Sequence, residues 1–207
     1  MSTEGVSTAS ELELLDEGFF TRSVHDVARD LIGCTLLYRG VGGVIVETES
    51  YAADDPACHA YNGPTPRNAP LFGPPGRAYV YLSYGIHKLL NAVTEPEGEP
   101  GAVLVRALRP AAGLARMVER RRRTDPRRLC SGPGKLSEAL GIGLEQNGAP
   151  LTHPPFELYG RGPREKPTAI VAGPRIGITK AAERPWRFCL AGSEFLSLPV
   201  AAVQAAG

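Results

Sequence analysis

Residues 44–51 read VIVETESY, an apolar run that ends in two carboxylates, Glu47 and Glu49. Because side chains alternate along a strand, Glu47, Glu49 and Tyr51 are predicted to share one face. Carboxylates that end a core strand are costly to bury. They either reach solvent at a sheet edge or serve as acid or base in a cleft, and this segment alone favours the solvated edge.

Three of the seven tyrosines lie within residues 79–85, YVYLSYG. On a strand, Tyr79, Tyr81 and Ser83 share one face, and Tyr84 falls at a turn beside Gly85. Clustered tyrosines usually fill a core or an interface. Stacking on nucleobases is the alternative.

The sequence gives little support for a zinc site, a Ser-His nucleophile or a P-loop. His59 follows Cys58 in a Pro/Gly-rich segment, but the four histidines include no i,i+4 pair, which argues against a zinc site. No G-x-S-x-G turn occurs, so a Ser-His nucleophile has no support. Residues 131–135, SGPGK, lack the length and the Ser/Thr of a P-loop and are at most a backbone anion site at a helix start.

Charge nearly cancels over the 207 residues, with 23 Lys+Arg against 22 Asp+Glu, so no net basic field announces a nucleic-acid partner. Residues 101–130 are the exception, since nine arginines there face only Glu119 and Asp125. Such a block is either a solvated helix face or a phosphate-facing patch, and the residues alone favour neither.

The composition, 43% apolar and 22% charged, fits one compact domain and excludes disordered, collagenous and coiled-coil chains. The chain has neither a secretory signal pattern nor a run of eighteen apolar residues, so we expect a soluble, intracellular protein. The four cysteines stand far apart with no C-x-x-C, which predicts reduced thiols.

Short strands are the elements that must position these residues. We expect strands over 34–39, 41–51, 78–83, 89–93, 102–108, 169–172, 176–178 and 186–191. Helices are predicted over 24–31, capped by Ser23 with Asp26 and stopped by Gly33, and over 111–122 and 135–140. Residues 52–76, with six prolines and three glycines, predict one long surface loop.

These elements lack the regular strand-helix rhythm of a parallel sheet. The predicted class is α+β, a single domain with a mostly antiparallel, curved, barrel-like sheet and peripheral helices. We expect a frayed segment over 1–12 and one domain over 13–207.

Five sequence words occur in one order: VETESY (46–51), TPRN (65–68), YVYLSYG (79–85) with Asn91, LVRALRP (104–110) and CSGPGKL (130–136). Together they resemble the alkyladenine (3-methyladenine, or N-methylpurine) DNA glycosylase family over residues 14–198. Lys88 departs from that pattern, because an aromatic residue is commoner there. The resemblance implies a fold similar to the C-terminal domain of formyltransferases.

The same resemblance implies a monofunctional enzyme that flips a damaged purine nucleotide out of duplex DNA and hydrolyses its N-glycosidic bond, leaving an abasic site. The damaged purines implied are 3-methyladenine, 7-methylguanine, hypoxanthine and ethenoadenine. It implies no metal or organic cofactor and no membrane partner. We expect a monomer that acts on double-stranded DNA in the cytoplasm, at the nucleoid if the chain is bacterial.

Roles carry over residue by residue from the resemblance. Glu49 matches the general base that activates a water, and Arg106 matches the arginine that holds this water together with a backbone carbonyl near Ile176. The residues that correspond to the pocket around the extruded base are Tyr51, His59, Tyr81 and, at its floor, Asn91. The DNA-contacting residues are Tyr84 as the wedge, with Lys135, Arg121, Arg122 and Arg123 toward phosphates.

Two functions of other classes stay open. One is a non-catalytic nucleic-acid-binding module of the same fold, against which the pairing of Glu49 with Arg106 argues. The other is a small-molecule hydrolase built on Glu47 and Glu49, which leaves the arginine block unexplained.

Overall fold

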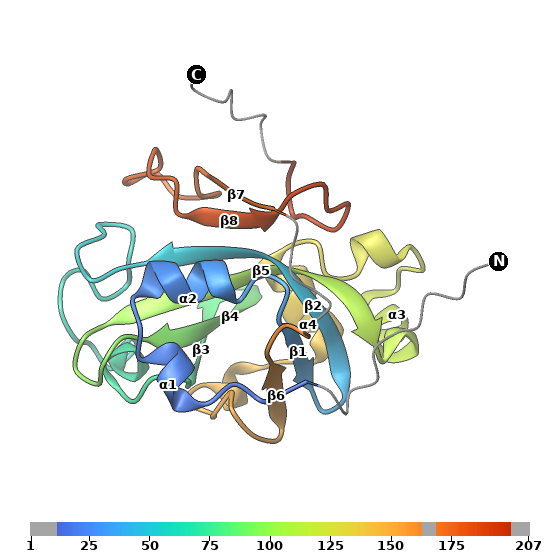
Figure 1. Ribbon diagram of the computed structural model, residues 1–207, viewed down its shortest axis with the longest axis horizontal. Helices are drawn as coiled ribbons and strands as arrows, with labels where there is room; N and C mark the ends of the chain where they lie inside the picture. The colour runs from blue at the N-terminus through green and yellow to red at the C-terminus, as the bar shows by residue number, and fades with distance from the viewer. Residues whose placement is uncertain (1–11, 163–168, 200–207) are drawn as a thin grey trace.

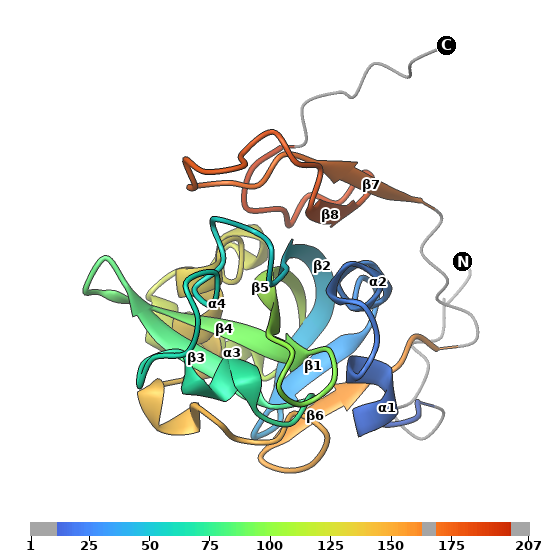
Figure 2. The ribbon, with the colours of Figure 1, turned by 90° about the vertical axis from the view of Figure 1, so that its left-hand side faces the viewer.

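A computed structural model describes residues 12–162 and 169–199, and the frayed segment expected over 1–12 lies outside these ranges except for Leu12. Within them, eight strands form one antiparallel sheet in the order β3-β4-β5-β2-β1-β6, while β8 pairs with β2 and β7 with β8. The strands are β1 (Thr35–Tyr38), β2 (Val41–Tyr51), β3 (Ala78–Ser83), β4 (His87–Thr94), β5 (Gly101–Ala112), β6 (Phe156–Tyr159), β7 (Ile170–Gly173) and β8 (Arg187–Leu190). The sheet curls into a half-barrel (Figure 2), which confirms the predicted α+β single domain.

Strand β2 is the centre of the sheet. It pairs with β5 along its length, and on its other edge first with β1 and then, from Glu47 to Glu49, with β8. A Cβ on Gly42 would lie 1.9 Å from the Leu36 carbonyl oxygen, and one on Gly43 would lie 2.0 Å from that of Arg109. Only glycine permits these backbone approaches.

Register shifts flank Glu47 in the pairing of β2 with β5. Such bulges bend a strand and re-aim its side chains. In Figure 1, β7 and β8 lie on the side of β2 away from β3 and β6. The carboxylate-bearing half of β2 therefore runs between the half-barrel and the β7–β8 layer.

The helices are peripheral, as predicted: α1 (Glu17–Phe20), α2 (Val24–Asp30), α3 (Leu114–Arg121) and α4 (Pro133–Leu140), with short 3-10 turns η2 (Ala69–Phe72), η3 (Pro126–Arg128) and η4 (Leu144–Gln146). Helix α2 packs on β2, where the Thr48 hydroxyl donates to the Ala28 carbonyl over 2.7 Å. Helix α4 packs against β4 and β5, and α3 against α4. Thr48 and its neighbours on that face of β2 thus belong to the core.

Three local predictions are wrong. Ser23 is the residue before α2, but its side chain makes no capping bond, and the first N–H of the helix, that of Val24, donates to the Glu95 carboxylate over 2.7 Å. Residues 111–112 end β5 instead of starting a helix, since Gly113, at φ +71°, makes the turn into α3. Residues 176–178 form a bend and not a strand, because Gly177 takes φ +76°.

Other predictions hold. Residues 52–76 form a loop interrupted only by η2. The four cysteines are buried free thiols, as expected of reduced residues. Burial raises the pKa of Cys34 to about 11 and those of Cys130 and Cys189 to about 12. No helix in the described part of the chain combines the length and the apolar character needed to cross a membrane.

Candidate active site

The two carboxylates of β2 point to one face of the sheet, as predicted, and both bind Arg106 on β5. Neither has any solvent exposure. The solvated-edge interpretation is therefore wrong, because β8 pairs along the edge that the sequence alone leaves open. Two buried carboxylates on one strand require compensating partners.

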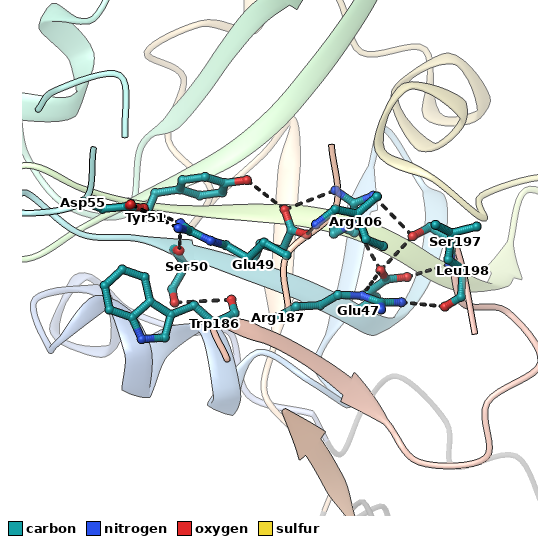
Figure 3. Close-up of polar contacts among 12 residues, drawn as sticks. Glu47, Glu49, Ser50, Tyr51, Asp55, Arg106, Trp186, Arg187, Ser197 and Leu198 are labelled. Atoms are coloured by element: carbon teal, nitrogen blue, oxygen red, sulfur yellow. Dashed lines mark hydrogen bonds and ion pairs between the residues drawn. The ribbon is translucent and has the colours of Figure 1, made fainter. Parts of the chain in front are cut away.

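Glu49 accepts hydrogen bonds from three groups, of which Tyr51 and Arg106 are labelled in Figure 3. Tyr51 Oη donates to Oε2 over 2.8 Å, and Arg106 Nη1 donates to the same oxygen over 3.1 Å. The backbone N–H of Ile176 donates to Oε1 over 2.7 Å. Since all three partners are donors, the arrangement suits a carboxylate that carries its charge. The structure thus brings together the three residues predicted as catalytic, with Tyr51 added to them.

Glu47 accepts four hydrogen bonds, and apart from Arg106 its donors differ from those of Glu49. Its Oε1 accepts from Arg106 Nε at 3.1 Å, from Arg187 Nε at 2.7 Å and from the Ser197 hydroxyl at 2.7 Å. Its Oε2 accepts from the Ser197 N–H at 2.6 Å. These bonds tie residue 197 to β2, and they leave Glu47 with no free face toward solvent (Figure 3). Glu47 is an anchor for Arg106.

Sequence reasoning missed Arg187 and Ser197. An arginine inside the apolar stretch predicted as the strand 186–191 is a signal of a buried acidic partner. Ser197 carried no comparable signal.

Arg106 joins the two carboxylates. Burial alone would lower the pKa of its guanidinium, but the charges of Glu49 and Glu47 outweigh burial and raise the pKa. Across the described residues, the buried carboxylates number three, as do the buried cationic side chains: Glu47, Glu49, Asp55, Arg106, Arg175 and Arg187. This balance is what allows so many charges to be buried near one another.

Next to this network lie two connected cavities. One, of about 240 Å³, is lined by Tyr51, His59, Tyr79, Tyr81 and Asn91 among others. The other, of about 370 Å³, is lined by Arg106, Ile176, Tyr84 and Lys135 among others. Tyr51 and Tyr81 line both cavities. Tyr51 therefore belongs at once to the cavity wall and to the hydrogen bonds of Glu49.

In the smaller cavity, His59 packs edge to face on Tyr79 and Tyr81, while the Tyr79 and Tyr81 rings are tilted by 30° to each other. The His59 ring lies 4.5 Å from that of Tyr81 at 67°, and His59 Nδ1 lies 2.9 Å from Tyr79 Oη. Partial burial, aided by the charge of Arg67, lowers the pKa of His59. Burial raises the pKa of Tyr81 to about 12. The walls are therefore uncharged aromatic rings at neutral pH, suited to stacking on a flat heterocycle.

Asn91, predicted at the floor of the base pocket, is among the residues that line the smaller cavity. Its side chain is buried, and Nδ2 donates to the Tyr79 carbonyl over 3.1 Å. This bond fixes the orientation of the amide.

Tyr84 sits at the tip of the β3–β4 hairpin with 86% of its surface exposed. Its φ is +49°, in the left-handed region that costs a non-glycine residue about 1–2 kcal/mol. Large exposed aromatic residues in strained turns are typical of functional positions. Lys135, exposed in the first turn of α4, lines the larger cavity together with Tyr84.

The three arginines predicted to meet phosphates differ from one another. Arg121 forms an ion pair with Glu138 and donates to the Leu129 carbonyl at 3.2 Å, so it is held within the protein. Arg122 and Arg123 are exposed beyond the end of α3.

No three His, Cys, Asp or Glu side chains gather as a metal site anywhere in residues 12–162 or 169–199.

Comparison with known proteins adds a family match and close relatives. Residues 18–194 match the family model described as methylpurine-DNA glycosylase. The chain is 60% identical over 186 residues, 90% of this chain and 89% of the relative, to a protein of Rhodopseudomonas palustris. It is 56% identical to relatives in Bradyrhizobium diazoefficiens, over 89% of this chain and 91% of that protein, and in Nitrosospira multiformis, over 87% and 92%. All three are named "Putative 3-methyladenine DNA glycosylase".

Proposed function

The chain belongs to the methylpurine-DNA glycosylase family, and on that premise we propose that it flips damaged purine nucleotides out of duplex DNA and releases the base with a water activated by Glu49. Family membership makes it a 3-methyladenine DNA glycosylase, a hydrolase of N-glycosyl bonds in base excision repair. The observation that carries the proposal is the position of Glu49. Its three donors, Tyr51, Arg106 and Ile176, all line the larger cavity.

In this mechanism a water lies between the Glu49 carboxylate and C1′ of the flipped deoxyribose. As the bond from C1′ to the purine nitrogen breaks, its electron pair leaves with the base, and the sugar takes on oxocarbenium character. The water oxygen then bonds to C1′ while its proton passes to Glu49. An alkylated purine that carries a positive charge leaves as a neutral base and needs no proton from the protein.

Arg106 and Ile176 would help to place that water. Arg106 is held by Glu47, so its guanidinium stays fixed while it bonds Glu49. The Ile176 N–H is used by Glu49, which leaves the carbonyl near this residue as the water's second partner, as the resemblance implies. Fixed dipoles of this kind need no reorganisation during the reaction.

The flipped base would stack in the smaller cavity. Tyr51, His59 and Tyr81 supply rings that are neutral at pH 7, and an electron-poor methylated purine stacks well between them. Flipping costs a few kcal/mol and costs less at a damaged pair, so extrusion and stacking select for damage together.

DNA would approach along the hairpin tip. Tyr84 would fill the gap left by the flipped nucleotide, because it is the most exposed large apolar side chain of the described residues. Lys135 at the start of α4, with Arg122 and Arg123, would meet phosphates. We further expect a monomer in the cytoplasm, where its DNA partner lies.

The test uses duplexes that each carry one 7-methylguanine, hypoxanthine or ethenoadenine, with the released base detected by chromatography. We expect free base and an abasic strand that breaks in alkali. Binding of the duplexes without any released base would favour a non-catalytic module. Failure to bind duplex DNA at low salt would favour a small-molecule hydrolase.

A further inference from the structure

One buried arginine has no place in the mechanism above. Arg175 directly precedes Ile176, and its side chain is wholly buried. Its Nη1 donates to the carbonyl of Ser50 over 3.0 Å. Ser50 stands between Glu49 and Tyr51 on β2. One guanidinium thus ties the bend that supplies the Ile176 N–H to the strand end that supplies both Glu49 and Tyr51.

Asp55 holds the guanidinium at both ends. Nη1 bonds Asp55 Oδ2, and Nη2 donates to Oδ1 over 3.0 Å. Asp55 also shapes the loop after β2, since its Oδ1 accepts the Ala57 N–H at 3.1 Å and its carbonyl accepts the Cys58 N–H at 2.8 Å. That turn leads directly into His59. The ion pair therefore connects the base-stacking wall to the catalytic carboxylate.

Two aromatic rings enclose the guanidinium. Its Cζ lies 4.6 Å from the centroid of the Tyr51 ring and 5.1 Å from that of Trp186. Guanidinium groups stack on aromatic faces through cation–π attraction. Arg175 therefore supports one face of the tyrosine whose hydroxyl donates to Glu49.

We propose that the Arg175–Asp55 pair positions Tyr51 and the Ile176 N–H on Glu49, so that base stacking and water activation share one rigid support. This inference rests on the proposed function. Arg175 acts through other residues and is a positioning residue. Replacement of a buried ion pair by apolar side chains often leaves stability unchanged or raises it, so stability alone does not account for this pair. Its contacts to Ser50, Asp55 and Tyr51 instead fix where Tyr51 and the Ile176 N–H lie relative to Glu49.

The test compares single-turnover excision of 7-methylguanine from a duplex by the wild type and by the double variant Arg175→Met/Asp55→Leu, which removes both charges. We expect excision slowed about 10- to 100-fold, because small displacements of positioned groups have effects of that size. We also expect the acidic limb of the pH–rate profile to move to higher pH, since the charged carboxylate would lose aligned hydrogen-bond donors. A merely structural role would not move that limb.

Arg184→Met is the matched control. Arg184 also stacks on Trp186, at 4.4 Å, but among the described residues no hydrogen bond or ion pair joins its side chain to Asp55, Ser50 or Tyr51. Its excision rate and pH profile should stay as in the wild type. Thermal unfolding and the fluorescence of Trp186, the one tryptophan of the chain, show whether each variant is folded.

Arg175→Lys carries the same test if the double variant does not fold, because it keeps the charge and loses the fork. Excision at the wild-type rate with an unmoved acidic limb, in either folded variant, would overturn the inference. A wild-type protein that releases no base would contradict the proposed function instead, so the two failures are distinguishable.

Discussion

The backbone N–H of Ile176 donates to Glu49 Oε1 across 2.7 Å, although 127 residues separate the two in the chain. Residues 176–178 form a bend and not a strand, so the Ile176 N–H is not used in a strand ladder and donates to the carboxylate. Glu49 itself is fully buried, and the residue that donates to it, Ile176, lines the larger cavity. This contact adds the bend between β7 and β8 to the residues that surround Glu49.

Replacement of Tyr84 by alanine should weaken binding to a lesion in duplex DNA by about tenfold or more, because only a duplex has a gap to fill. Binding of the free alkylated base should change little, since Tyr84 is 86% exposed at the hairpin tip. Fluorescence titration with both ligands measures the two affinities. Equal losses for both would mean that Tyr84 acts as a pocket wall.

The double variant Arg122→Ala/Arg123→Ala should lower affinity for any duplex and flatten the slope of log K against log salt. The change is up to roughly one unit for each true phosphate contact. Arg121→Ala is the matched control, because its guanidinium is held by Glu138 and Leu129. That control should lower thermal stability and leave the slope alone. An unchanged slope in the double variant would assign Arg122 and Arg123 to a solvated surface.

Asn91→Ser should raise the removal of guanine from mispairs relative to hypoxanthine. Guanine differs from hypoxanthine by its 2-amino group, and we expect the Asn91 amide, held by the Tyr79 carbonyl, to occupy the space which that group needs. The change in discrimination should be about 1–3 kcal/mol, the usual scale for one small group in a pocket. Single-turnover competition between the two bases opposite thymine measures it. A constant ratio would show that another feature excludes guanine.

The charge of the substrate should matter at acid pH. Partial burial lowers the pKa of His59 below its ordinary 6.5, so the ring is neutral at pH 7 and becomes cationic as the pH falls through that lowered pKa. Cationic 7-methylguanine should then lose about three- to tenfold in excision relative to neutral hypoxanthine. His59→Gln is the reference for pH effects that do not involve the ring. The same ratio in wild type and variant at every pH would rule out this role.

The pattern of the sequence predicted much of this site because it lies on regular elements. Alternation placed Glu47 and Glu49 on one face correctly, and Gly85 placed Tyr84 at a turn. It failed on their burial, because the burial depends on β8, which pairs with β2 from about 140 residues away. Single-strand arguments cannot include a partner so distant in the chain.

The supporting residues were missed for a related reason. Arg175 directly precedes the bend at 176–178, where the apolar residues Ile176 and Ile178 led to the prediction of a strand. Asp55 lies in a loop whose sequence shows neither helical nor strand periodicity. The ion pair between Arg175 and Asp55 forms only in the folded sheet, where the loop after β2 and the segment before Ile176 come together. Ser23 shows a different failure: a favourable capping pattern makes no side-chain bond, while the Val24 N–H at the helix start donates to Glu95, which is 71 residues away.

The central claim is that Glu49 activates the water, and Glu49→Gln tests it most directly. Glutamine keeps the size of the side chain but cannot take the proton, and a positioned base typically contributes about 10²- to 10⁴-fold in rate. Glu47→Gln is the matched control: it removes the same charge from the anchor of Arg106, so it should lower thermal stability and slow excision less. The measurement is single-turnover excision of 7-methylguanine, with the affinity for the lesion duplex determined in parallel. We predict that Glu49→Gln loses excision by that factor while affinity changes less than about threefold. Excision by Glu49→Gln at the wild-type rate would contradict the account.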